Sequence, residues 1–438
     1  MNEPLENSGN LLRQRRFLPL FITQFLGALN DNVIKNAMVV LLTFQAASWT
    51  TLTPGLLANL AAGIFILPFF LFSATAGQLA DKYDKALLAR LVKLLETLIV
   101  LVAGAGFMAR RIEILFTALF LLGLHSTLFG PIKYAILPQH LRADELVSGN
   151  ALVEAGTFIA ILGGTLCGGL LAAVPDATVW ITLSGLLIAG GGYCAAHFIP
   201  AAVPPAPTLR VSLNPLAATW RNLSVARKNR EVLIAIVGIS WFWLYGALFL
   251  AQFPAYAKNT LGGDETVVTL LLATFIIGIG SGSLLCATFV RRHPQRGLAL
   301  VLPGCFGLTV FALDVAFASP MAQADAAALS ALAILHAPGI WRMLADFTLL
   351  GLCGGLFSVP LYTWLQQSSE VDQRARMIAA NNIVNALFMV VGSLGAAAAL
   401  SAGLSIPALF GYAALGNALI GVVLYRRMVE LRLRSADG

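Results

Sequence analysis

The chain has 438 residues, of which 58% are hydrophobic and only 11% are charged. Because soluble globular proteins carry about 25% charged residues, this composition excludes a soluble domain and predicts an integral membrane protein. The formal net charge of +7 would suit a nucleic-acid-binding protein. The positions of the basic residues exclude that class, because most of them lie in short segments between apolar runs.

Twelve apolar runs are long enough to cross a bilayer, for which about 20 residues suffice. We expect all of them to be α-helices, because helices satisfy their own backbone groups in lipid and no run alternates like a barrel strand. The fold class is therefore all-α and integral to the membrane. The predicted spans are residues 17–44, 54–80, 86–108, 113–138, 146–174, 178–199, 231–257, 266–290, 297–318, 342–367, 375–401 and 405–425.

The distribution of Lys and Arg predicts how the spans are oriented. When residues near the end of a span are counted with the adjoining loop, 21 of the 28 basic residues lie on the same side as the N-terminus, 4 lie on the other side, and 3 lie within spans. Cytoplasmic loops are enriched in Lys and Arg, so we expect both termini in the cytoplasm. The polar N-terminal segment is expected to be a cytoplasmic lead-in and not a signal peptide.

A long connection separates six spans from six. Residues 200–230 begin proline-rich, and the part after Pro215 has apolar and basic residues at helical spacing, which predicts an interfacial amphipathic helix. We expect an N-terminal six-helix half (1–199), a cytoplasmic linker (200–230) and a C-terminal six-helix half (231–438). The fourth and fifth spans share an order of aromatic, proline, tyrosine and glutamine residues with the tenth and eleventh, which indicates a repeat or a chance similarity of apolar helices.

The first span carries polar residues where hydrocarbon would surround them. Its middle contains Asn30, Asp31 and Asn32, with Lys35 one turn later, and Gln24 falls on the same helical face as Asp31. An ionisable side chain near the bilayer centre costs between about 2.5 and 17 kcal/mol, so this face is predicted to line a substrate path. The alternative is an ion pair between Asp31 and Lys35, four residues apart, that only holds helices together.

Polar residues also mark the fourth and fifth spans. Lys133 is a cation that can meet a phosphate as a point charge; the alternative is that it pairs only with Asp31 or Glu154. Glu154 lies four residues after Asn150, and this pair is expected to contact a headgroup or join a polar network. Which lysine Asp31 meets stays open. If protons or sodium drive transport, Asp31 and Glu154 are the candidate groups.

Other polar residues in the spans receive simpler interpretations. Asn381 and Asn385 place amides at helical spacing on the eleventh span, facing a cavity or a partner helix. Lys93 and Glu96 lie one turn apart in the third span and are expected to be a structural pair. His125 in the fourth span is expected to be hydrogen-bonded and structural, although a histidine can titrate near neutrality.

The loop between the second and third spans has the sequence GQLADKYDK (77–85). Gly77 lets a neighbouring helix approach closely, Asp81 can accept hydrogen bonds from another helix's N-terminus, and Lys82 and Lys85 place charge at the membrane surface. The string resembles the Gly-x-Leu-Ala-Asp-Arg/Lys-x-Gly-Arg/Lys loop of the major facilitator superfamily, departing at Asp84, where that family has glycine. The resemblance implies a major facilitator fold and a gating role for Gly77, Asp81, Lys82 and Lys85.

Three stretches together carry a narrower resemblance: Gln24–Ala37, Phe129–Gln139 and Gly149–Ile161. They are similar to the lysophospholipid transporter family of Gram-negative bacteria, and especially to the transporter domain fused in some bacteria to an acyltransferase and an acyl-carrier-protein synthetase. We expect no such acyltransferase on this chain. The seventh span lacks the arginine that stand-alone members can carry, which puts headgroup and coupling details in question.

A lysophospholipid has a charged head and one acyl tail, so its path needs a polar site beside an apolar slot. Aromatic residues of the seventh span are candidates to wall the slot, with an interfacial aromatic belt as the alternative. They are Trp241, Phe242, Trp243, Tyr245, Phe249 and Phe253.

The resemblance implies a secondary transporter that moves lyso-phosphatidylethanolamine and lyso-phosphatidylglycerol from the outer to the inner leaflet of the bacterial inner membrane for re-acylation. The alternatives are a proton-coupled exporter of drugs or siderophores on the same fold, and a non-transporting scaffold. No nucleophile–base constellation, phosphate loop or metal cluster is apparent, so we expect no enzymatic activity, cofactor or metal. The expected partners are the lysophospholipid, membrane lipids and a separate lysophospholipid acyltransferase, with the transporter itself a monomer.

Overall fold

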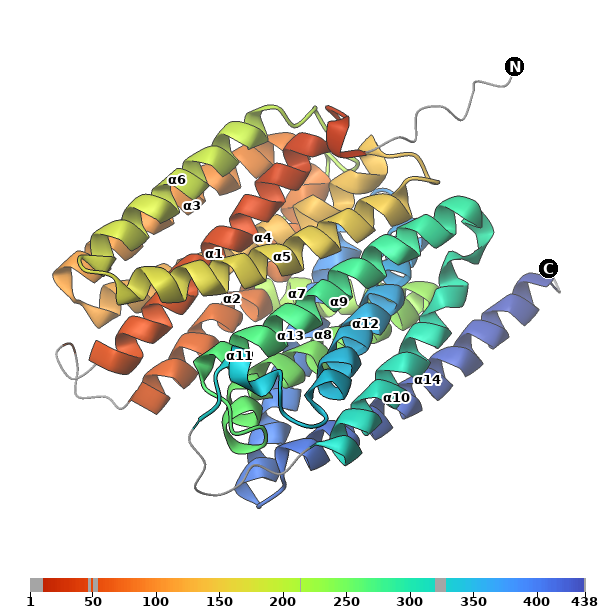
Figure 1. The fold of residues 1–438 in the computed structure, drawn as a ribbon. Helices are drawn as coiled ribbons and strands as arrows, with labels where there is room; N and C mark the ends of the chain where they lie inside the picture. Colours follow the sequence, from red (N-terminus) through yellow and green to blue (C-terminus); the bar gives the residue numbers. More distant parts are fainter. Residues whose placement is uncertain (1–10, 46–48, 50–53, 213, 320–327, 437–438) are drawn as a thin grey trace. The chain divides into compact units, whose positions relative to one another are not determined.

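The computed structural model describes residues 11–45, 49, 54–212, 214–319 and 328–436. This part of the chain is almost entirely helical, and it contains no β-strand beyond a single bridge between Gly263 and Leu329. The chain divides into two compact units (Figure 1). Residues 1–228 and 369–383 make up the first unit, and residues 229–368 and 384–438 make up the second.

Long helices build both units. Six long helices and one short one lie in the first unit: α1 (Leu18–Gln45), α2 (Pro54–Lys82), α3 (Lys85–Ala109), α4 (Ile112–His140), α5 (Leu146–Ala173), α6 (Ala177–His197) and α7 (Pro215–Lys228). The second unit holds α8 (Arg230–Asn259), α9 (Glu265–Arg292), α10 (Val301–Ala318), α11 (Ala331–Ile334), α12 (Ile340–Ser368) and α14 (Ile406–Ala436). Helix α13 (Arg374–Ser401) begins in the first unit and continues in the second.

The twelve predicted spans correspond to twelve long helices in the described residues, α1–α6, α8–α10 and α12–α14. Eleven of these are long and apolar enough to cross a membrane. The remaining helix, α3, is 25 residues long and carries four ionisable side chains; it is not among those eleven. The all-α, membrane-integral fold class is confirmed.

Helix α3 separates its apolar and charged side chains onto opposite faces. Leu87, Leu91, Leu94, Leu98 and Leu101 are all exposed and recur at alternating four- and three-residue steps, which places them on one stripe. The charged side chains at 85, 93 and 96 are buried instead. A surrounding membrane explains this arrangement. Exposed leucines are stable in contact with lipid, whereas an ionised side chain in lipid is costly and therefore faces the protein interior.

The same helix pairings recur in the two units. Helix α2 packs on α4 and α3 packs on α6 in the first unit, while α9 packs on α12 and α10 packs on α14 in the second. Figure 1 shows α3 beside α6 and α10 beside α14. These are the pairings that an internal repeat of six helices predicts.

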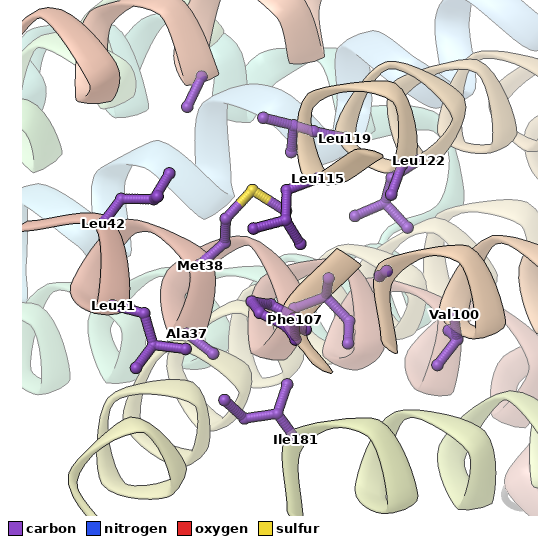
Figure 2. Packing of buried hydrophobic residues seen from close by; sticks show 14 of the residues in the cluster. Ala37, Met38, Leu41, Leu42, Val100, Phe107, Leu115, Leu119, Leu122 and Ile181 are labelled. Atoms are coloured by element: carbon purple, nitrogen blue, oxygen red, sulfur yellow. The ribbon is translucent and has the colours of Figure 1, made fainter. Parts of the chain in front are cut away.

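A hydrophobic core joins α1, α3, α4 and α6 of the first unit. Met38 of α1 points toward Leu115 of α4, and Ile181 of α6 approaches α1 from its other side (Figure 2). Phe107 of α3 is 1% exposed within the same cluster. The interior of this half of α1 is therefore apolar, and the polar residues of the helix lie toward its N-terminal side.

The second unit has an aromatic core. Phe249 of α8 stacks on Phe410 of α14 with 4.1 Å between ring centroids, and Phe347 of α12 packs edge-on against Phe253. Phe249 and Phe253 are fully buried. These two residues therefore stabilise the packing of α8, α12 and α14, and neither the predicted acyl-tail slot nor an interfacial belt describes them.

Glycines let α5 lie against the backbone of α1. A Cβ at Gly168 would lie 2.6 Å from the carbonyl oxygen of Val33 and 3.1 Å from the backbone nitrogen of Ala37. A Cβ at Gly164, one turn earlier, would lie 2.7 Å from the Cβ of Asn32. The small-xxx-small spacing of these glycines is the one that lets membrane helices approach closely.

We expect Gly168→Val to destabilise the protein by about 1–3 kcal/mol, the usual cost of overpacking a filled interface. Gly169→Val is the matched control, because a Cβ at Gly169 meets no heavy atom within 4 Å. The measurement is unfolding in mixed micelles followed by circular dichroism. Equal stability of the two variants would contradict the close approach of α1 and α5.

Candidate functional site

A network of buried charges lies among α1, α3 and α4 of the first unit. Lys93 and Glu96 of α3 form an ion pair, and both side chains are fully buried. Asn30 of α1 donates a hydrogen bond from Nδ2 to Oε1 of Glu96 at 2.7 Å. His125 of α4 places Nε2 at 3.2 Å from Oε2 of Glu96. One carboxylate therefore draws a cation, an amide and an imidazole from three helices.

The network continues from His125 to Asp31. The Nδ1 atom of His125 lies 3.7 Å from Oδ1 of Asp31, and Ser126 donates a hydrogen bond to Oδ2 of Asp31. Both ring nitrogens of His125 thus face carboxylate oxygens, and only the imidazolium form can donate from both nitrogens. With His125 protonated, Lys93 and His125 balance Glu96 and Asp31.

Two glycines make room for the Lys93 amine. A Cβ at Gly192 of α6 would lie 2.8 Å from Nζ of Lys93, and a Cβ at Gly27 of α1 would lie 3.2 Å from it. The backbones of α1 and α6 therefore close around the cation, which has no room for a hydration shell. A charge held this way depends on Glu96, since an unpaired buried ion is strongly unfavourable.

Asp31 is paired with neither lysine that the sequence offered. Among the described residues, no ion pair within 4.0 Å joins Asp31 to Lys35 or to Lys133; the partners of Asp31 are His125 and Ser126. The Nζ atom of Lys35 lies 5.2 Å from the ring centre of Phe65. The Nζ atom of Lys133 lies 4.8 Å from the ring centre of Tyr134, a cation–π distance in both cases.

Lys133 lies within electrostatic range of Glu154 and Asp31. Glu154 of α5 is buried and accepts a hydrogen bond from the Tyr134 hydroxyl at 3.2 Å. Its second oxygen, Oε1, has no hydrogen-bond partner in the described part of the chain. A partly exposed ammonium and a carboxylate oxygen with spare capacity therefore lie near each other on α4 and α5.

The remaining candidates on α1 and α5 have local partners. Gln24 accepts a hydrogen bond from the Thr157 hydroxyl at 3.0 Å, while its Nε2 is buried without a partner among the described residues. Asn32 donates to the carbonyl oxygen of Ala28 at 2.8 Å. Asn150 donates to the carbonyl oxygen of Leu146 at 3.0 Å.

Asn381 and Asn385 lie one turn apart on α13 but fall in different units. Asn385 belongs to the second unit and accepts a hydrogen bond from the Ser240 hydroxyl at 2.7 Å. Asn381 belongs to the first unit and is fully buried, and neither atom of its amide has a hydrogen-bond partner within the described residues. Their roles in substrate binding stay predictions.

The C-terminal end of α2 holds the first turn of α13. The buried carboxylate of Asp81 accepts hydrogen bonds from the backbone nitrogens of Ala375 and Arg376 at 3.0 and 3.2 Å, and from Nε of Arg376 at 3.0 Å. Such a carboxylate at a helix N-terminus is stabilised by the unpaired N–H groups there. A Cβ at Gly77 would lie 2.7 Å from the Cβ of Ala379, so this glycine allows α13 to approach.

The residues that follow Asp81 do not contact α13 in the same way. Asp84 caps α3 by accepting from the backbone nitrogens of Ala86 and Leu87 at 2.8 and 3.0 Å. This carboxylate gives the turn a side-chain cap at the position where the superfamily loop has glycine. Lys85 is almost fully buried, whereas the Nζ atom of Lys82 lies over the Tyr83 ring at 5.5 Å.

Sequence reasoning found every member of the buried network except Ser126, but it did not join them. From the sequence, Lys93 and Glu96 are expected to be a structural pair and His125 to be hydrogen-bonded and structural, both separate from Asp31. The signal that could have joined them is charge compensation. Four ionisable residues on three apolar helices of one half are expected to meet, because each is costly when alone.

We expect Lys93→Met and Glu96→Gln each to lower the free energy of unfolding by about 3–5 kcal/mol, because each leaves one buried partner uncompensated. The double variant should lose clearly less than the sum of the two. The exposed pair Arg111 and Glu113, joined at 3.2 Å, is the control, and its loss should cost about 0–1 kcal/mol. Additive effects in the buried pair, measured by unfolding in mixed micelles, would contradict the coupling.

Comparison with known proteins gives the fold a family. The family model described as the Major Facilitator Superfamily matches residues 20–329. Over 94% of this chain and 99% of the other, the fold is similar to the fucose:proton symporter FucP of E. coli, with a TM-score of 0.70 at 14% identity. The human organic anion transporter MFSD10 is similar over the same shares of both chains, with a TM-score of 0.69 at 15% identity.

Curated relatives match most of the chain. The lysophospholipid transporter LplT of Pectobacterium carotovorum subsp. carotovorum (strain PC1) is 29% identical over 395 residues, which is 87% of this chain and 86% of that protein. The lysophospholipid transporter LplT of Serratia proteamaculans (strain 568) is 27% identical over 84% of each chain. The chain therefore belongs to the Major Facilitator Superfamily, and it is a multi-pass membrane transporter and not an enzyme.

Proposed function

We propose that this transporter moves lysophospholipids across the bacterial inner membrane, from the outer to the inner leaflet, where an acyltransferase re-acylates them. The substrates are lyso-phosphatidylethanolamine and lyso-phosphatidylglycerol. Two lines of support meet here: the curated relatives named as lysophospholipid transporters, and the chemistry of the polar residues on α1, α4 and α5. Transport proceeds by alternating access of two six-helix halves, residues 1–199 and 231–438, joined by the linker 200–230.

The observation that carries the proposal is that a lysine and a carboxylate, Lys133 and Glu154, lie near each other without forming an ion pair in the described part of the chain. Lys133 is partly exposed and held over an aromatic ring, with no carboxylate within ion-pair distance among the described residues. Glu154 keeps one carboxylate oxygen without a hydrogen-bond partner in that same part of the chain. A zwitterionic headgroup fits such a pair, because its phosphate meets the ammonium while its amine meets the carboxylate.

Asp31 gives the site a second carboxylate that is fixed in place. Ser126 donates a hydrogen bond to one of its oxygens and His125 lies 3.7 Å from the other, whereas neither Lys35 nor Lys133 is within ion-pair distance of it among the described residues. Both lysines are therefore available to the phosphate. Lys35, Gln24, Asn30, Asn32 and Asn150 complete the proposed polar wall, and Asn381 and Asn385 are proposed to contact the substrate from α13.

The test is flipping of fluorescent lyso-phosphatidylethanolamine in vesicles that contain the purified protein. We expect the wild type to be faster than protein-free vesicles, and Lys133→Met and Asp31→Asn each to lower the rate about tenfold or more, as loss of a charged contact of about 1.5–3 kcal/mol implies. Glu113→Gln, at an exposed position, should leave the rate unchanged.

The possible failures of this test are distinguishable. If the folded wild-type protein moved lysolipid no faster than protein-free vesicles, the proposed substrate would be wrong. If both variants flipped at the wild-type rate, the proposed headgroup site would be wrong while the transport function stood.

We also propose that Gly77, Asp81, Lys82 and Lys85 gate the conformational change. The three hydrogen bonds that Asp81 accepts hold the start of α13 against α2, and they must break if α13 moves away. Bonds to a charged group contribute about 1.5–3 kcal/mol each. Their loss would therefore shift the balance between the state that keeps this contact and the state that breaks it.

We expect Asp81→Asn to open the contact between α2 and α13 more often. Ala379 is fully buried against Gly77, so a cysteine introduced by Ala379→Cys, with Cys167 and Cys194 replaced, reports opening through its rate of thiol labelling. Labelling should be about tenfold faster in Asp81→Asn, and unchanged in Asp144→Asn, whose side chain is 57% exposed. Equal labelling in all three would remove Asp81 from the gate.

A further inference from the structure

The linker between the halves is bound to the C-terminal end of α2, which contains Asp81, and to the turn that follows it. The backbone nitrogen of Ala206 donates to the carbonyl oxygen of Asp81 at 3.0 Å, and that of Ala202 donates to the carboxylate of Asp84 at 2.9 Å. Ser212 donates from its backbone nitrogen to the side-chain oxygen of Gln78 at 2.7 Å. A proline-rich segment that would otherwise be a flexible tether is thereby fixed on the first unit.

Helix α7 continues from this linker and packs on the first unit with one face only. Ala218 lies in a buried cluster with Ala74 of α2 and Ile383 of α13. Asn222 and Ala226, each one turn further along, are buried as well. Spacing by four residues places these three small side chains on one stripe, so α7 contacts both helices whose approach Asp81 controls.

The opposite face of α7 is uncovered and has the composition of a membrane-surface helix. Leu216 and Trp220, one turn apart, are 74% and 68% exposed. Arg221, Arg227 and Lys228 are exposed too. The helix contains no acidic residue, so its outer face combines an apolar anchor with three positive charges.

Helix α7 is followed directly in the chain by a helix that can span the membrane. Asn229 caps α8 by accepting from the backbone nitrogens of Glu231 and Val232 at 3.1 and 3.2 Å, and α8 is one of the helices able to span the membrane. Arg227 and Lys228 therefore precede a membrane span by only two or three residues. Residues this close to the end of a span are expected near the membrane surface, where tryptophan and basic side chains meet lipid headgroups.

We propose that α7 docks on the anionic headgroups of the surrounding bilayer, with Trp220 and Leu216 at the interface and Arg221, Arg227 and Lys228 over the phosphates. Through the linker, this docking anchors the end of α2 that contains Asp81. Anionic phospholipids thus hold one side of the α2–α13 contact. The inference does not depend on which substrate the transporter moves.

The test is hydrogen exchange of the full-length protein in nanodiscs of phosphatidylcholine, with and without phosphatidylglycerol. We expect the amides of residues 215–228 to exchange at least about fivefold more slowly with the anionic lipid, since one basic residue near an anionic surface contributes about that factor in binding. Residues 199–212 should be protected in parallel. High salt should abolish the protection, because it screens charges at the surface.

A matched pair of variants makes the test specific. The triple variant Arg221→Gln, Arg227→Gln and Lys228→Gln should lose the lipid-dependent protection, whereas Arg291→Gln with Arg292→Gln, at the exposed end of α9, should keep it. Equal exchange of the wild type in both nanodiscs would overturn the proposal, as would protection that follows protein concentration in place of lipid charge. Protection of 215–228 without protection of 199–212 would overturn the anchoring step.

Discussion

The ion pair between Lys93 and Glu96 is the interaction on which the arrangement of the first unit depends. Neither side chain reaches solvent, so water cannot solvate the two charges. Polar groups from other helices must take the place of that water. Asn30 comes from α1 and His125 from α4, while Gly27 and Gly192 bring the backbones of α1 and α6 up to the amine. The pair thereby fixes α1, α3, α4 and α6 around one point, and α3 can present an unbroken leucine stripe to lipid.

The same network determines what Asp31 can do. Ser126 donates a hydrogen bond to one oxygen of Asp31 and His125 approaches the other at 3.7 Å, so the neighbours of this carboxylate come from α4 and not from a lysine. Lys35 and Lys133 rest on aromatic rings instead, an interaction weak enough for a phosphate to replace. The structural ion pair and the proposed binding site are therefore connected through His125, which contacts both Glu96 and Asp31.

The sequence predicted the fold almost completely and the site only in part. Membrane helices are set by local apolar runs, so the predicted limits 113–138 and 146–174 lie within a few residues of α4 (Ile112–His140) and α5 (Leu146–Ala173). Contacts between helices are not local. Spacing along α1 suggested Lys35 as a partner of Asp31, but His125 meets it from α4. Likewise, aromatic composition could not show that Phe249 would face Phe410 inside a core.

Asp81 binds two segments of the chain, one through its side chain and the other through its main chain. Its carboxylate binds the start of α13, whereas its carbonyl oxygen binds the linker at Ala206. The carbonyl belongs to the main chain and survives any side-chain replacement at position 81. A substitution at position 81 can therefore change the grip on α13 while this bond to the linker stays in place. The other two bonds to the linker use the side chains of Asp84 and Gln78, so the attachment as a whole depends on the residue types at 78 and 84 and on the main chain at 81.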